Sequence, residues 1–189
     1  MSEKLSFVVI LLFVLFIGTL RQADAAGSFS ILYGSKSLNE SDWEPVDSQS
    51  GLGFGFEVVN PGSPTSFVFT YLSTDDSAFD SYYGIMLNGE TTEILLGIRR
   101  YLTPDKNRFF IEGGLASIKA EFGGFKGSVS ASESDSATGY WVGFGMDFPV
   151  DRQFSVGLLG RISDADVKLF NVEGEAGGTT LGFFGAYHF

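Results

Sequence analysis

The chain ends on GTTLGFFGAYHF, residues 178–189, and this stretch decides how everything before it is interpreted. In a β-strand, successive side chains point to opposite faces. One face would carry Thr179, Leu181, Phe183, Gly185, Tyr187 and Phe189. The other would carry Thr180, Gly182, Phe184, Ala186 and His188. An apolar face opposite a mostly small or polar face is typical of a strand that lies between hydrocarbon and a packed interior.

The same ending resembles the closing strand of bacterial outer-membrane barrels. In that family, a terminal phenylalanine with an aromatic residue two positions earlier serves as the assembly signal, and Phe189 and Tyr187 occupy these positions. The resemblance implies that the barrel-assembly machinery recognises the last strand. An edge strand of a soluble β-sandwich could end in the same way, so the rest of the chain has to decide.

Apolar residues at every second position predict seven further strands. The clearest is 51–59, where large apolar residues alternate with glycines and Glu57. The predicted strands are 28–37, 51–59, one that starts near 66, 92–102, 108 to about 120, 139–148, 153–163 and 178–189. The end of the third strand is left open, because 82–87 could extend its hairpin beyond the membrane.

The connections between these strands alternate in length. The long ones are 38–50, 75–91, 121–137 and 164–177, and the short ones are 60–64, 103–107 and 149–152. Such alternation is expected when one barrel rim carries tight periplasmic turns and the other carries extracellular loops. A soluble sandwich has no reason to separate loop lengths in this way. We therefore predict an all-β fold, an eight-stranded antiparallel transmembrane β-barrel with up-and-down meander topology.

With this pattern and length, the chain resembles the small outer-membrane barrels of the OmpA-domain, OmpX and OmpW kind. The resemblance implies an integral location in the outer membrane of a Gram-negative cell. It brings no catalytic motif, and therefore implies a fold and a location rather than an activity.

The first 25 residues are predicted to be a cleavable signal peptide, which leaves 26–189 as the barrel domain. Lys4 supplies a positive start, 5–20 form an apolar run, and Ala23-Asp24-Ala25 offers a cleavage site. An uncleaved anchor is the alternative, but the run is shorter than the roughly 20 residues of a spanning helix.

The composition restricts the partners. The 189 residues carry a net charge of −11, which argues against nucleic acid because phosphate binding needs a positive surface. The sequence has no cysteine, so disulfides and thiol chemistry are excluded. We expect a monomer without cofactor, surrounded by outer-membrane lipid and lipopolysaccharide.

Charged residues on the predicted inner faces must pair, because an isolated charge in a narrow interior is costly. Counting from the turn at 103–107 places Arg99 opposite Glu112, with Glu57 at a similar depth. Glu93 and Arg161, with Trp141, are expected to share a higher level. This predicted ion-pair network could be a proton or ion path, but an electrostatic plug that fixes the barrel is favoured.

Other candidate sites are weaker. His188 is the one histidine, and it is expected to face inward at the periplasmic rim without a Ser nucleophile near it in sequence, so we predict no enzyme. Four acidic residues of the first connection could hold a hard cation together with lipopolysaccharide phosphates: Glu40, Asp42, Glu44 and Asp47. No spacing matches a calcium-loop motif, so solvated loops are favoured and no metal centre is predicted.

Aromatic residues near the outer rim are interpreted as a membrane-interface girdle rather than a ligand cage. They are Trp43, Tyr82, Tyr83, Phe122, Phe125 and Phe170.

The predicted function is a non-enzymatic integral outer-membrane barrel with a side-chain-filled lumen and four acidic extracellular loops. It would act in envelope structure or surface interaction. One alternative is an OmpW-like conduit for small hydrophobic compounds, which needs an apolar pocket at the outer end of the lumen. Glycines of two predicted strands could leave that room or accommodate large neighbours: Gly51, Gly53, Gly55, Gly143 and Gly145. A lipid-modifying barrel enzyme is the third class.

Overall fold

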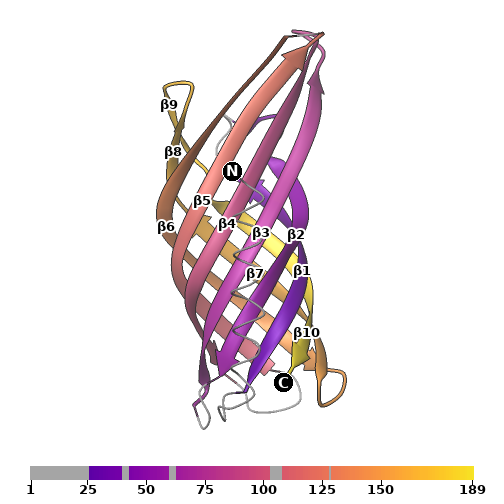
Figure 1. The fold of residues 1–189 in the computed structure, drawn as a ribbon, viewed down its shortest axis with the longest axis vertical. Coiled ribbons are helices and arrows are strands. Elements are labelled where there is room, and N and C mark those ends of the chain that lie inside the picture. The colour runs from indigo at the N-terminus through magenta and orange to yellow at the C-terminus, as the bar shows by residue number, and fades with distance from the viewer. Residues whose placement is uncertain (1–25, 40–42, 60–62, 103–107, 128) are drawn as a thin grey trace, which may run out of the picture.

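The computed structural model describes residues 26–39, 43–59, 63–102, 108–127 and 129–189. Within these ranges, eight strands form a closed antiparallel barrel in meander order, with β1 closing on β10 (Figure 1). The barrel strands are β1 Gly27–Leu38, β2 Ser48–Val59, β3 Thr65–Asp80, β4 Ile85–Tyr101, β5 Arg108–Lys126, β6 Val129–Pro149, β7 Phe154–Asp164 and β10 Gly178–His188. The predicted fold class is confirmed. The predicted signal peptide at 1–25 and the turn at 103–107 lie outside the described residues.

The alternation of side chains follows the predicted faces. Residues predicted to face outward are exposed on the described strands: Ile31, Leu52, Phe67, Leu96, Leu115, Phe144, Leu158 and Leu181. An apolar belt of this extent is far larger than the patches of soluble monomers and matches the lipid-facing band of transmembrane barrels. No helix in the described part of the chain is long and apolar enough to span a membrane.

Two of the long connections are not loops. β3 runs to Asp80 and β4 starts at Ile85, while β5 runs to Lys126 and β6 starts at Val129. The predicted connections 75–91 and 121–137 are therefore mostly the upper parts of two paired hairpins. We call residues 75–90, 121–127 and 129–137 the protruding sheet, which rises beyond the other strands (Figure 1). The apolar period stops where both faces meet water, so the pattern marked the end of the hydrocarbon and not the end of the strands.

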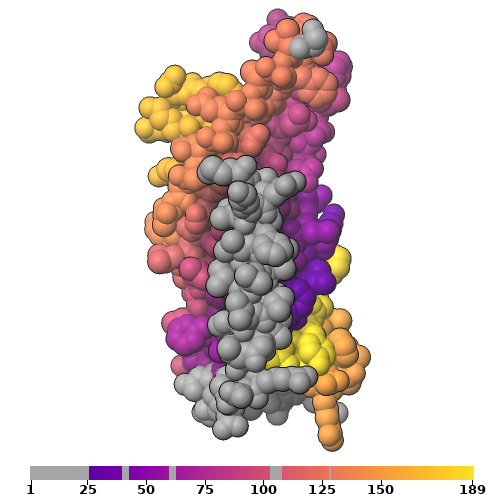
Figure 2. All heavy atoms as spheres, in the orientation of Figure 1, coloured from indigo at the N-terminus to yellow at the C-terminus, as the bar shows by residue number. Residues whose placement is uncertain are grey.

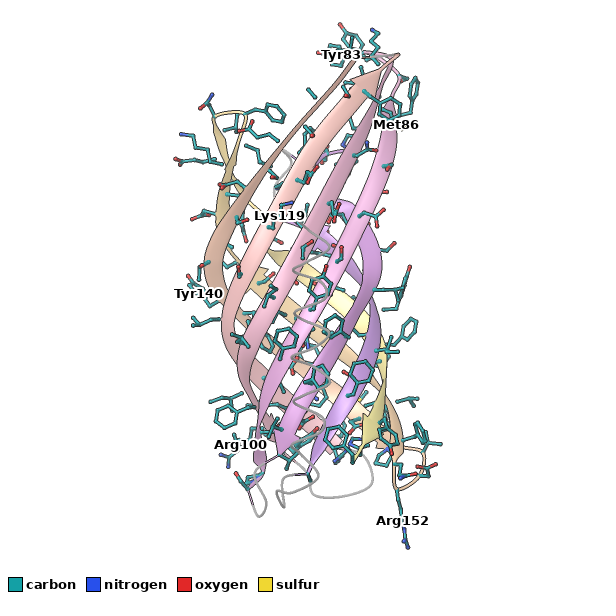
Figure 3. All side chains as sticks on the ribbon, viewed as in Figure 1. Tyr83, Met86, Arg100, Lys119, Tyr140 and Arg152 are labelled. Atoms are coloured by element: carbon teal, nitrogen blue, oxygen red, sulfur yellow. The ribbon has the colours of Figure 1, made fainter. Side chains whose placement is uncertain are left out.

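The protruding sheet and the described short turn at 149–152 occupy opposite ends of the molecule. Figure 3 shows Tyr83 and Met86 at one end and Arg100 and Arg152 at the other. The chain terminus lies at the second end, beside Gly27, whose backbone exchanges two hydrogen bonds with Phe189 at 3.0 and 3.1 Å. This arrangement matches long extracellular extensions opposite short periplasmic turns.

The last long connection contains a small hairpin, formed by β8 Asp166–Leu169 and β9 Val172–Glu175. It lies beside the upper part of β6 (Figures 1 and 2). Asp135 accepts the backbone N–H of Lys168 at 2.8 Å, and Glu133 accepts that of Phe170 at 2.8 Å. The hairpin is not paired with β6 in a sheet. Instead, side-chain carboxylates of β6 hold its backbone in place.

The first connection folds back into the barrel mouth. The Val46 N–H donates to the Trp43 carbonyl at 2.8 Å, and the Leu38 N–H donates to the Asp47 carbonyl at 2.9 Å. Val46 is fully buried and Trp43 is 4% exposed. Residues 43–47 therefore form a cap over the lumen.

Candidate functional site

The lower lumen contains an ion-pair network contributed by four strands. Arg99 of β4 donates to Glu112 of β5 at 2.7 and 2.9 Å and to Glu57 of β2 at 3.0 Å. Arg161 of β7 donates to the other oxygen of Glu112 at 2.8 Å. Glu112 therefore joins two guanidinium groups, and its side chain is fully buried. Arg99 and Glu112 are also direct cross-strand partners, the register that counting from the turn predicted.

Hydroxyl groups and aromatic rings complete this network. Glu57 accepts hydrogen bonds from Ser66 at 2.6 Å and from Tyr101 at 2.9 Å. The Arg99 guanidinium lies 4.0 Å from the Phe110 ring centroid, and Arg161 lies 5.1 Å from that of Trp141. The cavity beside these groups has a volume of about 20 Å³, which is room for water and not for a larger solute.

A second pair crosses the lumen above this network. Lys36 of β1 donates to Glu93 of β4 at 2.7 Å and to the Ala176 carbonyl at 2.8 Å, and Ser163 donates to Glu93 at 2.9 Å. Glu93 was expected to share a level with Arg161, but the structure gives these residues different partners. Strand tilt shifts the levels of distant strands, so distance from a turn does not fix depth across the barrel.

Lys36 is a site residue that the sequence analysis missed. It is fully buried. It lies an even number of positions from Ser28 and Ser30 on the same strand, so it shares the inner face predicted for them. Extending that alternation along the same predicted strand would have placed Lys36 in the lumen.

A third, uncharged layer closes the mouth. Thr74 donates to Gln49 at 3.0 Å and lies 2.9 Å from the Thr91 hydroxyl, which also contacts Gln49. Above them, the Gln49 amide donates to the Val46 carbonyl at 3.4 Å. Above the periplasmic end, the described residues thus cross the lumen in two charged layers and one neutral layer, with the cap above them.

The periplasmic end holds His188, whose Nε2 lies 2.8 Å from the Ser155 hydroxyl. This serine is 33 residues away and could not be found from local sequence. Nearby, Arg108 forms an ion pair with Asp147. The cavity that His188 lines is the one of about 20 Å³, so an acyl chain cannot reach the Ser–His pair from the lumen.

The candidate loop cation site is only partly described. Glu40 and Asp42 lie outside the described residues, Glu44 is exposed and Asp47 is half-buried. Across the described ranges, no group of three or more acidic, histidine or cysteine side chains is arranged to hold a metal.

The aromatic girdle prediction is wrong for Trp43. Its ring is buried, its indole N–H donates to the Glu175 carbonyl at 2.9 Å, and its ring centroid lies 6.1 Å from that of Phe122. Together with Phe170, these rings line a hollow of about 300 Å³ beside the β8–β9 hairpin. Tyr82 and Tyr83 are exposed at the tip of the protruding sheet instead. The pattern could not separate these roles because it gave no position for the hairpin.

The comparisons with known proteins agree with the fold. The sequence matches no protein-family model, and the comparison with curated proteins gives no match. Among solved structures, Ail, the attachment invasion locus protein of Yersinia pestis, shows a TM-score of 0.61 at 18% identity, over 88% of this chain and 100% of that chain. A major outer membrane protein of Thermus thermophilus shows a TM-score of 0.59 at 12% identity, over 86% of this chain and 99% of that chain.

Neisserial surface protein A shows a TM-score of 0.52 at 11% identity, over 87% of this chain and 97% of that chain. These likenesses confirm, at the level of the fold, the predicted resemblance to small eight-stranded outer-membrane barrels. Together with the apolar belt, they support an integral outer-membrane location.

Proposed function

We propose that this protein is a non-enzymatic outer-membrane barrel with a closed lumen, which acts in envelope structure or surface interaction through its extracellular part. The observation that carries the proposal is the stack of side-chain layers that cross the lumen. Arg99, Glu112 and Arg161 form one charged layer, Lys36 and Glu93 form the next layer above it, and the neutral layer at Gln49 lies above both. Each layer joins side chains from strands that are not adjacent in the barrel, so a solute would have to break buried ion pairs.

The conduit alternative requires an apolar pocket at the outer end of the lumen that continues inward, but the lumen below the cap is crossed by the polar layer of Gln49, Thr74 and Thr91 and by the Lys36–Glu93 pair. The lumen glycines do not leave a passage. A Cβ added at Gly51 would meet the backbone of Ser73, and one added at Gly145 would meet the Phe110 ring. These glycines therefore accommodate neighbouring strands and rings, which supports a filled interior over a channel.

The geometry also argues against a lipid-modifying enzyme. Ser155 and His188 form a hydrogen bond, but they face the lumen at the periplasmic end. A nucleophile that acts on outer-leaflet lipid would have to lie at the other rim with room for the substrate. We interpret the pair as a structural contact.

The protruding sheet is the surface that we propose to contact a partner. The upper part of β3, 76–80, has paired backbone groups toward β4, and no described β2 residue pairs with it. Such an edge can receive a strand from another polypeptide. Exposed aromatic side chains lie at its tip: Phe79, Tyr82, Tyr83 and Phe125.

Charge favours a protein over an anionic polysaccharide at this surface. The Ail structure contains the heparin analogue sucrose octasulfate. In this chain the base of the protruding sheet carries Asp75, Glu90 and Glu121 as direct cross-strand neighbours. A polyanion would be repelled there, whereas cations shared with lipopolysaccharide phosphates would be attracted.

Planar-bilayer recordings test the closed lumen. We expect no steady ion conductance from the purified full chain. The double variant Lys36→Ala with Glu93→Ala removes one charged layer and should also stay closed, because the lower network at Arg99 is untouched. Steady conductance of the unaltered protein would reject the closed lumen and favour the conduit.

The C-terminal strand is proposed to engage the barrel-assembly machinery. Phe189 and Tyr187 are 46% and 39% exposed, and the Tyr187 ring centroid lies 5.2 Å from that of Phe154. Because Phe189 buries limited area, Phe189→Ala should lower the amount of protein in the outer membrane while refolding in detergent stays nearly normal. Leu181→Ala, which removes another exposed outer-face side chain of the same strand, is the matched control. Equal membrane yields for the two variants would contradict an assembly role.

A further inference from the structure

The hollow beside the β8–β9 hairpin lies at the extracellular mouth of the barrel, outside the layers that close the lumen. It has a volume of about 300 Å³, and its walls come from the cap, β5 and the hairpin: Trp43, Phe122, Leu169, Phe170 and Val172. The Trp43 indole N–H is already bonded to the Glu175 carbonyl. The tryptophan therefore presents an apolar ring, and the walls are mainly hydrocarbon and aromatic.

The hollow is held in place by contacts that do not depend on a ligand. Asp135 and Glu133 of β6 fix the backbone of the hairpin through Lys168 and Phe170. The Ala176 N–H donates to the Ala165 carbonyl at 2.9 Å at the base of the hairpin. Pockets that bind small molecules are usually preformed in this way and have volumes from about 300 Å³ upward.

Phe170 occupies a position that its backbone does not favour. Leu169 pairs with Val172, so Phe170 and Asn171 form a two-residue turn with φ angles of 50° and 63°. Asn and Gly suit both positions of such a turn, whereas a bulky residue in the left-handed region is strained. The turn itself does not require a phenylalanine at position 170, but the Phe170 ring forms part of the wall of the hollow.

Charge and access define what can enter. Glu133 and Asp135 lie beside the hairpin and Glu175 lies at its base, so an anion such as a fatty acid would be repelled. A second hollow of about 300 Å³ shares Phe122 and Phe170 with the first and continues along the protruding sheet toward Phe125 and Val129. This side faces the extracellular end, away from the closed lumen.

We propose that this hollow binds a small uncharged apolar molecule, of the size of a two- or three-ring aromatic compound, from the extracellular side. The site goes beyond the proposed surface role. It requires no passage through the barrel, because the molecule enters between the hairpin and the protruding sheet.

Binding can be measured with the full chain in phosphatidylcholine nanodiscs and the uncharged probe N-phenyl-1-naphthylamine, after subtraction of the signal from empty nanodiscs. A saturable, one-to-one increase in fluorescence is expected. Val172→Phe fills the hollow and should weaken binding at least tenfold. Val150→Phe, at a similarly exposed apolar position in a periplasmic turn, should leave it unchanged. Absence of a saturable component in the unaltered protein would overturn the proposal.

Phe170→Asn separates binding from folding, because asparagine suits the turn. The Lys168 amide should keep its protection from hydrogen exchange while probe binding falls at least tenfold. Unchanged binding in this variant would overturn the site. The anionic probe 8-anilinonaphthalene-1-sulfonate has similar rings and should bind at least tenfold more weakly than the neutral probe. Equal affinity for the two would overturn the assignment to uncharged molecules.

Discussion

The protruding sheet consists of the upper parts of four of the eight barrel strands, yet it treats carboxylates in the opposite way to the barrel interior. Inside the barrel, Glu57, Glu93 and Glu112 are buried, and each forms an ion pair with a lumen cation. Above the membrane, Asp75 lies directly opposite Glu90, and Glu90 lies directly opposite Glu121. Lys119 approaches this row only in an exposed pair, with its Nζ 3.4 Å from Glu121.

The difference shows how solvent decides what a strand tolerates. Water and salt screen exposed charges, so like charges on neighbouring strands cost little and opposite charges add little. In the lumen the low dielectric makes an unpaired charge costly, so nearly every buried ion has a specific partner. The position of a residue on a strand determines which face its side chain occupies. The solvent or protein around that face determines the energetic cost of an unpaired charge.

The largest expected effect comes from breaking the lower network at its centre. Glu112→Gln leaves two guanidinium groups without their shared carboxylate, and a broken buried pair costs about 3–5 kcal/mol. Arg99→Met should cost less, because Glu112 keeps Arg161 and Glu57 keeps the hydroxyls of Ser66 and Tyr101. The free energy of unfolding of each variant, from reversible urea titration in lipid vesicles, shows which of the two loses more stability.

The double variant sharpens this test. Neighbouring residues in one network do not contribute additively, so Arg99→Met with Glu112→Gln should cost less than the two single losses combined. Small, additive losses would mean that each lumen charge keeps its own water, and the contrast with the protruding sheet would disappear.

A smaller effect of opposite sign is expected at the acidic row. Glu90→Gln removes the like charge that faces Asp75 and Glu121, and cross-strand pairs are worth about 0.2–1 kcal/mol. We expect a slight increase in stability at low salt that disappears at high salt. The matched control is Glu93→Gln, three residues away on β4. This change leaves the buried Lys36 without its carboxylate partner and should lower the stability of the barrel. Loss of stability in Glu90→Gln would contradict the screening argument.

The smallest effect is a pH dependence of hairpin docking. The backbone N–H groups of Lys168 and Ser136 hold the pKa of the Asp135 carboxyl below its usual value. Because the docked state has the lowered pKa, its advantage is complete above the ordinary aspartate range and is lost as pH falls through the docked pKa. The Lys168 amide chemical shift should report this release during acid titration.

Asp135→Asn is the control for this titration. The amide oxygen of the asparagine can still accept the Lys168 N–H, but the side chain no longer changes charge, so the Asp135 contribution to the titration curve should vanish. An unaltered titration curve would assign the release to another group.

The sequence by itself determined the direction of the side chains and therefore the class of fold. A strand places alternate residues on opposite faces by local geometry, so Phe144 and Trp141 could be assigned to lipid and lumen without further information. Counting residues from one turn along the two strands predicted the Arg99–Glu112 register in the same way. The extent of the strands was not determined, because their polar upper parts lose the apolar period once both faces are in water.

Only the tertiary structure decided which residues meet across the lumen and above it. Lys36 and Glu93 are 57 residues apart, and Arg161 and Glu112 are 49 apart. Their contacts depend on closure of the barrel and on the tilt and stagger of all eight strands together. Likewise, the hollow at Trp43 exists because the cap and the β8–β9 hairpin fold back over β5 and β6. Local periodicity has no information on such contacts, because they are set by the collective geometry of the closed sheet.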